Sequence, residues 1–142
     1  MGTTEETELD VSVDQLQSLL DAYPVRLALV FGSHARKDAS ERSDIDIAVE
    51  FDDPELDASR YNKLFLGLGA ELEVALSSSV DLVDLHRVDP ALAERILDEG
   101  ILVLGSRDRL NELETRFRRE TAEESPLERF DAALERLDGH LA

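Results

Sequence analysis

The sequence predicts an α/β domain in which helices pack on a small mixed β-sheet. Four short apolar runs have the length of strands, and segments with helical spacing of apolar residues lie between them. The chain has 142 residues, of which 42% are hydrophobic, and this is enough for one core. It contains no cysteine, so packing must stabilise it without disulfides or cysteine-bound zinc.

The first half of the chain is expected to contain two strands and two helices. Residues 1–10 are polar and acidic, and we expect a flexible terminus there. Ser12 and Gln15 fit a capping box that begins a helix, and Pro24 ends that helix. The elements expected next are a largely buried strand at 25–31, a short helix at 34–39 and a strand at 44–51.

The second half is expected to complete the sheet. Leucine and aromatic residues recur at helical spacing after a polar loop, and two further apolar runs are short enough to be strands. Proline near a helix start and glycine at its end give the bounds of the helix between these runs. The expected elements are a helix at 59–77, a strand at 80–85, a helix from Asp89-Pro90 to Gly100 and a strand at 101–104, which complete a domain at 11–105.

Residues 106–142 differ in composition from the preceding domain and are expected to form a helical extension. A thin apolar stripe of Leu110, Leu113 and Phe117 lies on a helix rich in arginine and glutamate. Pro126 separates this helix from a second amphipathic segment. Two interpretations remain open: the extension covers the open face of the sheet as part of the same domain, or it binds a partner chain.

The chain is strongly acidic, with 33 acidic and 15 basic residues and a net charge of -18. This charge argues against direct nucleic-acid binding, which normally requires a basic face. No apolar run is long enough for a membrane helix, and the N-terminus lacks the features of a signal peptide, so a cytoplasmic protein without membrane contact is expected. Acidic excess with only two lysines is typical of halophilic proteins; an acidic partner-binding surface is the alternative.

The halophilic interpretation makes a prediction about salt. Repulsion between carboxylates opposes folding at low salt, and the Debye length shrinks from about 10 Å at 0.1 M to about 3 Å at 1 M. The melting temperature should therefore rise steeply over this range of KCl concentration, as followed by circular dichroism. A flat or falling curve would favour the partner-binding surface instead.

One segment of the sequence has the pattern of a functional site. In the expected strand at 44–51, Asp44 and Asp46 share one face and the apolar residues share the other. Two carboxylates this close repel each other unless a cation lies between them, and oxygen ligands suit a hard ion such as Mg²⁺. The alternative is a purely structural role, in which a turn joins two core strands and the acidic residues are solvated.

Gly32 and Ser33, which end the preceding strand, add an anion-binding pattern. A glycine allows a sharp turn and close approach to a ligand, and amides at a following helix N-terminus favour phosphate. Arg36 could add a forked donor to phosphate oxygens. The nearby Glu50 is expected to be solvated, as is His34 in the Gly-Ser turn, whereas His86 and His140 have no ligand partners at metal spacing.

Gly32-Ser33, followed after ten residues by Asp44-x-Asp46, resembles the signature of the DNA polymerase β-like nucleotidyltransferase superfamily. The short chain is most similar to the minimal nucleotidyltransferases (MNT), antitoxins paired with HEPN-domain toxins in prokaryotes. The resemblance covers about 25–104. It implies that 11–105 is a nucleotidyltransferase domain and that AMP passes from Mg-ATP to a tyrosine of a HEPN toxin. It also implies an oligomer that contains both proteins.

The resemblance also implies roles for individual residues. Asp44 and Asp46 would hold two Mg²⁺ ions, with a third carboxylate from a neighbouring strand completing the metal site and favouring deprotonation of the acceptor. Asp81 matches the family context and is preferred, whereas Asp84 is the alternative if the strand contains a bulge. Residues expected to contact the nucleotide are Gly32, Ser33, Arg36 and, more weakly, Ser43.

Two other functions remain open beside this one. A non-catalytic antitoxin would neutralise its partner by binding alone, although such a protein has no need of three neighbouring carboxylates. A nucleotidyltransferase acting on a small molecule is the third alternative. Enzymes of that kind commonly carry a larger acceptor-binding domain, for which this chain has little room.

Overall fold

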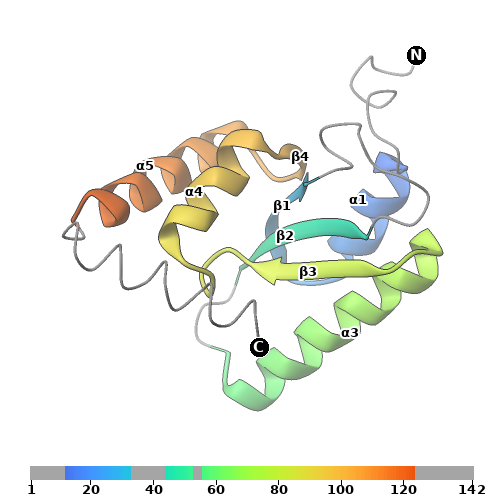
Figure 1. The fold of residues 1–142 in the computed structure, drawn as a ribbon. Helices are drawn as coiled ribbons and strands as arrows, with labels where there is room; N and C mark the ends of the chain where they lie inside the picture. Colours follow the sequence, from blue (N-terminus) through green and yellow to red (C-terminus); the bar gives the residue numbers. More distant parts are fainter. Residues whose placement is uncertain (1–11, 33–43, 53–55, 124–142) are drawn as a thin grey trace.

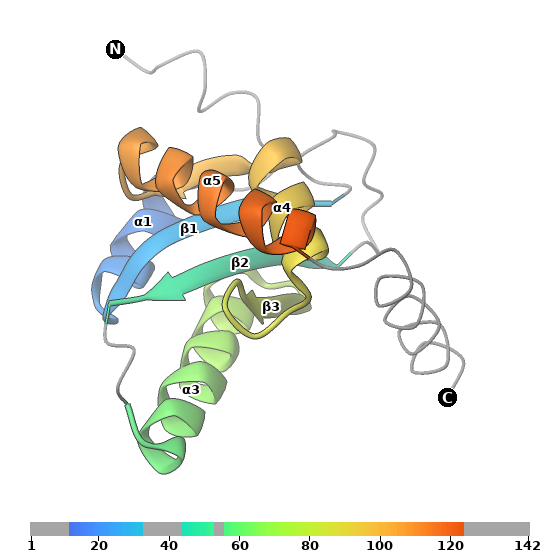
Figure 2. The same ribbon diagram turned by 90° about the vertical axis from the view of Figure 1, so that its left-hand side faces the viewer.

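The computed structural model describes residues 12–32, 44–52 and 56–123. They form a four-stranded sheet between two layers of helices, with α1 and α3 on one face and α4 and α5 on the other (Figures 1 and 2). The predicted fold class is confirmed. In chain order the elements are α1 (Val13–Asp21), β1 (Val25–Phe31), β2 (Ile45–Phe51), α3 (Ala58–Leu76), β3 (Val80–Asp84), α4 (Pro90–Glu99), β4 (Ile101–Leu104) and α5 (Arg107–Glu123).

Short polar side chains cap three helices: Ser12 and Asp89 where the sequence indicated a helix start, and Asp57 two residues before the start expected at 59. The Ser12 hydroxyl accepts a hydrogen bond from the amide of Gln15 at 3.2 Å and caps α1. Asp57 caps α3 in the same way, and Asp89 caps α4 with Pro90 at the first helical position. The flexible terminus expected at 1–10 and the short helix expected at 34–39 lie outside the described residues.

The strand order is β3-β2-β1-β4. β1 pairs antiparallel with both β2 and β4, whereas β2 and β3 are parallel, so the sheet is mixed as predicted. The parallel pair requires a crossover, and α3 provides it along one face of the sheet (Figure 1). As a result, the N-terminal ends of β2 and β3 lie side by side at one edge of the sheet.

Each face of the sheet has its own apolar core. Alternate residues of β2, namely Ile45, Ile47 and Val49, pack with α1 and α3, whereas Ala48 packs with α4 and α5. Side chains of β2 at even-numbered positions therefore lie on the face covered by α4 and α5. The alternation predicted for this strand is confirmed.

The apolar stripe of α5 is buried within the chain itself. Leu110, Leu113 and Phe117 are only 3%, 0% and 3% exposed and pack with residues of α4 and the sheet. The helix α5 that carries them lies beside α4 over this face of the sheet (Figure 2). These side chains cover one face of the sheet and are not presented to a partner. The segment after Pro126 lies outside the described residues. In the part of the chain that the structure describes, no helix is both long and apolar enough to span a membrane.

Candidate functional site

The candidate site begins at the turn that follows β1. Gly32 has a φ of +72°, a conformation that side chains with a Cβ rarely adopt. A Cβ at this position would overlap Oδ2 of Asp46 and would lie 3.1 Å from its Cγ. Glycine thus allows the backbone at the end of β1 to approach the Asp46 carboxylate closely, since Phe31 and Asp46 are paired across β1 and β2.

Two carboxylates come together where β2 and β3 begin. The parallel register pairs Asp46 with Asp81, and neighbouring strands lie about 4.8 Å apart. Their flanking residues Ile45, Ile47, Val80 and Leu82 pack on the side of α1 and α3. Asp46 and Asp81 therefore share the opposite face, where Asp46 is half-buried and Asp81 is exposed. Asp44 is exposed and directly precedes β2.

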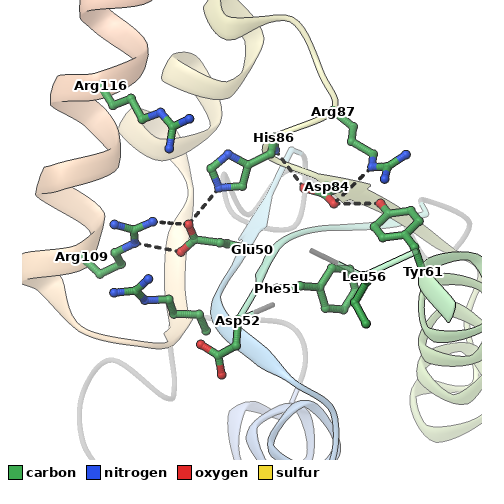
Figure 3. A pocket seen from close by; sticks show the side chains of 11 residues that line it. Glu50, Phe51, Asp52, Leu56, Tyr61, Asp84, His86, Arg87, Arg109 and Arg116 are labelled. Atoms are coloured by element: carbon green, nitrogen blue, oxygen red, sulfur yellow. Dashed lines mark hydrogen bonds and ion pairs between the residues drawn. The ribbon is translucent and has the colours of Figure 1, made fainter. Parts of the chain in front are cut away.

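Asp84 takes part in a different set of contacts. It is paired with Val49 in the sheet and is 8% exposed. Its Oδ2 accepts a hydrogen bond from the Tyr61 hydroxyl at 2.8 Å, and its Oδ1 accepts one from the amide of His86 at 2.8 Å (Figure 3). Burial and the bond to Asp84 raise the pKa of Tyr61 above its usual range. The register thus places Asp81, rather than Asp84, next to Asp46.

The carboxylates at the N-terminal ends of β2 and β3 supply the oxygen ligands that Mg²⁺ prefers. They do not form a complete Mg²⁺ site by themselves. Among the described residues, no group of three or more histidine, aspartate or glutamate side chains converges enough to hold a metal ion. Mg²⁺ is commonly bound by one or two carboxylates together with substrate phosphates, not by a cage made of protein alone. The Asp46 and Asp81 pair fits that kind of site. Ser33, Arg36 and Ser43 lie outside the described residues.

A second polar cluster lies near the opposite end of β2, and the sequence did not indicate it. Glu50 is only 2% exposed, so the expectation that it is solvated is wrong. Its Oε1 accepts a hydrogen bond from Nε of Arg109 at 2.9 Å, and Nη2 of the same arginine contacts Oε2 (Figure 3). Nε2 of His86 lies 2.8 Å from Oε2.

These contacts determine the charge of Glu50. Burial alone raises the pKa of a carboxyl group, but the hydrogen bonds from Arg109 and His86 outweigh burial and lower the pKa of Glu50 to about 2. Glu50 is therefore ionised at neutral pH. The alternation along β2 is the one sequence signal that could have suggested its burial, because Glu50 shares a face with Asp46 and Ala48.

A family profile and the sequences of curated relatives both match this chain, and both belong to nucleotidyltransferases. The sequence profile described as "Polymerase beta, Nucleotidyltransferase" matches residues 14–109. The protein adenylyltransferase MntA of Thermococcus cleftensis is 35% identical over 104 residues, which cover 72% of this chain and 98% of that protein.

Solved structures have the same fold. A chain in a crystal structure described as a toxin-antitoxin with AMP-PNP superposes with a TM-score of 0.70 at 26% identity, over 92% of this chain and 98% of that one. A chain from the structure of a tri-AMPylated Shewanella oneidensis HEPN toxin in complex with an MNT antitoxin superposes with a TM-score of 0.64. This second chain is 23% identical, over 98% of this chain and 100% of that one, and it supports the fold alone.

Proposed function

Because this chain belongs to the polymerase β-type nucleotidyltransferase family, we propose that it transfers AMP from ATP to a tyrosine of a HEPN toxin and thereby neutralises the toxin. The observation that carries this proposal is the pair of carboxylates, Asp46 and Asp81, held in register beside the Gly32 turn. The name of the Thermococcus cleftensis relative supports the reaction. The toxin-antitoxin structure with an ATP analogue supports the nucleotide and the kind of partner.

In the proposed reaction, the tyrosine oxygen forms a bond to the α-phosphorus of ATP. The bond between that phosphorus and the oxygen bridging to the β-phosphate breaks, and pyrophosphate leaves. Asp81, the exposed carboxylate of the pair, would assist loss of the hydroxyl proton. Mg²⁺ bound by Asp44, Asp46 and Asp81 would supply neutralisation of the phosphate charge.

The residues around the carboxylates would hold the nucleotide. The positive φ of Gly32 lets the backbone approach the β- and γ-phosphates without a Cβ in the way. Ser33 would donate to the same phosphates, and Arg36 would bind a phosphate oxygen with its forked donors. Ser43 is a weaker candidate for a further contact.

The direct experiment is coexpression with a HEPN toxin encoded next to this chain, followed by intact-mass measurement of the toxin. Each transferred group should add the mass of one AMP residue, and peptide fragmentation should place it on tyrosine. If the toxin is bound and neutralised but never gains this mass, even with excess ATP and Mg²⁺, the protein acts by binding alone.

Replacing Gly32 with alanine should impair the site. The left-handed conformation costs a residue with a Cβ about 1 kcal/mol, and the new methyl group must displace the Asp46 carboxylate. We expect transfer to fall at least tenfold, measured with labelled ATP. Gly67→Ala is the matched control, because a Cβ there meets only the Tyr23 hydroxyl at 3.6 Å. Equal activity of the two variants would contradict the proposed close approach.

A further inference from the structure

A cavity of about 420 Å³ lies near the ends of β2 and β3 that are opposite the Asp46 and Asp81 pair (Figure 3). Glu50 at its wall is four residues after Asp46 on β2, which corresponds to about 13 Å along the strand. Its volume is within the range of small-molecule sites. The proposed transfer reaction does not use this cavity.

Arginine side chains are concentrated around the cavity. Four of the 15 basic residues of this very acidic chain line it: Arg26, Arg87, Arg109 and Arg116. Arg109 and Arg116 extend from α5, and the guanidinium carbon of Arg87 lies 3.6 Å from the centre of the Tyr61 ring (Figure 3). Elements far apart in the sequence thus bring positive charge to one place.

Three carboxylates, those of Glu50, Asp52 and Asp84, line the cavity and offset part of this positive charge, and the four arginines exceed them by one. Glu50 is buried, and its two oxygens already accept hydrogen bonds from Arg109 and His86. Both oxygens of Asp84 are likewise occupied, by the Tyr61 hydroxyl and a backbone amide. Asp52 is the remaining carboxylate of the lining, and it is exposed.

Three arginines retain hydrogen-bond donors for a ligand. Arg26 forms no ion pair within residues 12–32, 44–52 and 56–123. Arg116 has a 3.6 Å contact with Glu120 of its own helix, and Arg87 lies 3.9 Å from an Asp84 oxygen that Tyr61 already contacts. A guanidinium group has five donors, so most of these donors remain available.

We propose that this cavity binds the phosphate group of a small phosphorylated molecule. Several guanidinium groups around one concave site match a dianion with three terminal oxygens, because each forked donor can bind two oxygens at once. Inorganic phosphate, pyrophosphate and a nucleoside monophosphate share this chemistry. The site is separate from the proposed nucleotide site, and the inference does not depend on the transfer activity.

Calorimetric titration of the full-length protein at constant ionic strength tests the proposal. The probes are inorganic phosphate, pyrophosphate and AMP, each with EDTA present to remove divalent cations. The double variant Arg26→Gln/Arg116→Gln should raise the Kd of at least one probe tenfold or more. Arg107→Gln/Arg119→Gln is the matched control, because both residues are exposed, lie on α5 and do not line the cavity. This control should change the Kd less than twofold.

The pattern across probes identifies the source of the phosphate. Tight binding of all three probes indicates recognition of the phosphate itself, whereas preference for AMP indicates a nucleoside phosphate. Shifts of backbone amide resonances should be centred on 84–87 and 109–116. The proposal is overturned if no probe binds at 10 mM, if both double variants weaken binding equally, or if the shifts are centred on Gly32 instead.

Discussion

Replacing Asp46 with asparagine is expected to abolish AMP transfer while the domain stays folded. Asparagine keeps the volume of the side chain but removes the charge that the proposed reaction needs beside Asp81 to bind Mg²⁺. Asp44→Asn should also abolish AMP transfer. The domain should stay folded, because Asp44 is exposed and contributes to neither apolar core. The measurement is incorporation of labelled AMP into the toxin, accompanied by a thermal melt followed by circular dichroism.

Asp21→Asn is a suitable control for these variants. It makes the same change in charge at an exposed position on α1, which covers the face opposite the carboxylate pair. This control should transfer AMP at the wild-type rate. Transfer by an Asp44→Asn/Asp46→Asn double variant at a comparable rate would exclude this edge of the sheet as the catalytic site.

Replacing Arg109 with methionine should destabilise the domain by about 3 kcal/mol at neutral pH. The substitution leaves the Glu50 carboxylate, 2% exposed, without its bidentate partner between β2 and α5. The free energy of unfolding, measured with urea at fixed salt, should fall by this amount. In contrast, Arg107→Met on the exposed side of the same helix turn should change it by less than about 0.5 kcal/mol.

The effect of Arg109→Met should depend on pH in a defined direction. The pKa of Glu50 is about 2 in the folded protein and 4.5 in an unperturbed glutamate, so its ionised form favours folding above pH 4.5. That contribution is lost as the pH falls from 4.5 towards 2. The difference in unfolding free energy between the wild type and the variant should therefore shrink over this interval. A difference that stays constant would mean that Arg109 stabilises the domain through packing alone.

The double variant Glu50→Leu/Arg109→Met distinguishes two causes of the lost stability: the unpaired charge of Glu50 and the lost packing of the Arg109 side chain. Removing both partners leaves no uncompensated charge in the interior, so much of the stability lost in Arg109→Met should return. If the double variant is less stable than Arg109→Met, the ion pair itself is not the cause of the loss.

The amino-acid sequence by itself determined where helices begin and which side chains of β2 lie on each face of the sheet. Capping residues such as Ser12, Asp57 and Asp89 begin helices through contacts within three residues along the chain. The alternation of Asp46 with Ile45 and Ile47 follows from the geometry of any strand. These features are local, and for this reason the fold class could be predicted from the pattern.

Only the tertiary structure decided which side chains meet across elements. Asp81 and Asp84 both fit the sequence pattern, and the register of the parallel pair put Asp81 next to Asp46 while Asp84 bonded to Tyr61. Glu50 and Arg109 are 59 residues apart, and no local pattern in the sequence predicts that they form an ion pair. Register and ion pairing depend on the packing of the whole chain, so local periodicity could determine neither the neighbour of Asp46 nor the burial of Glu50.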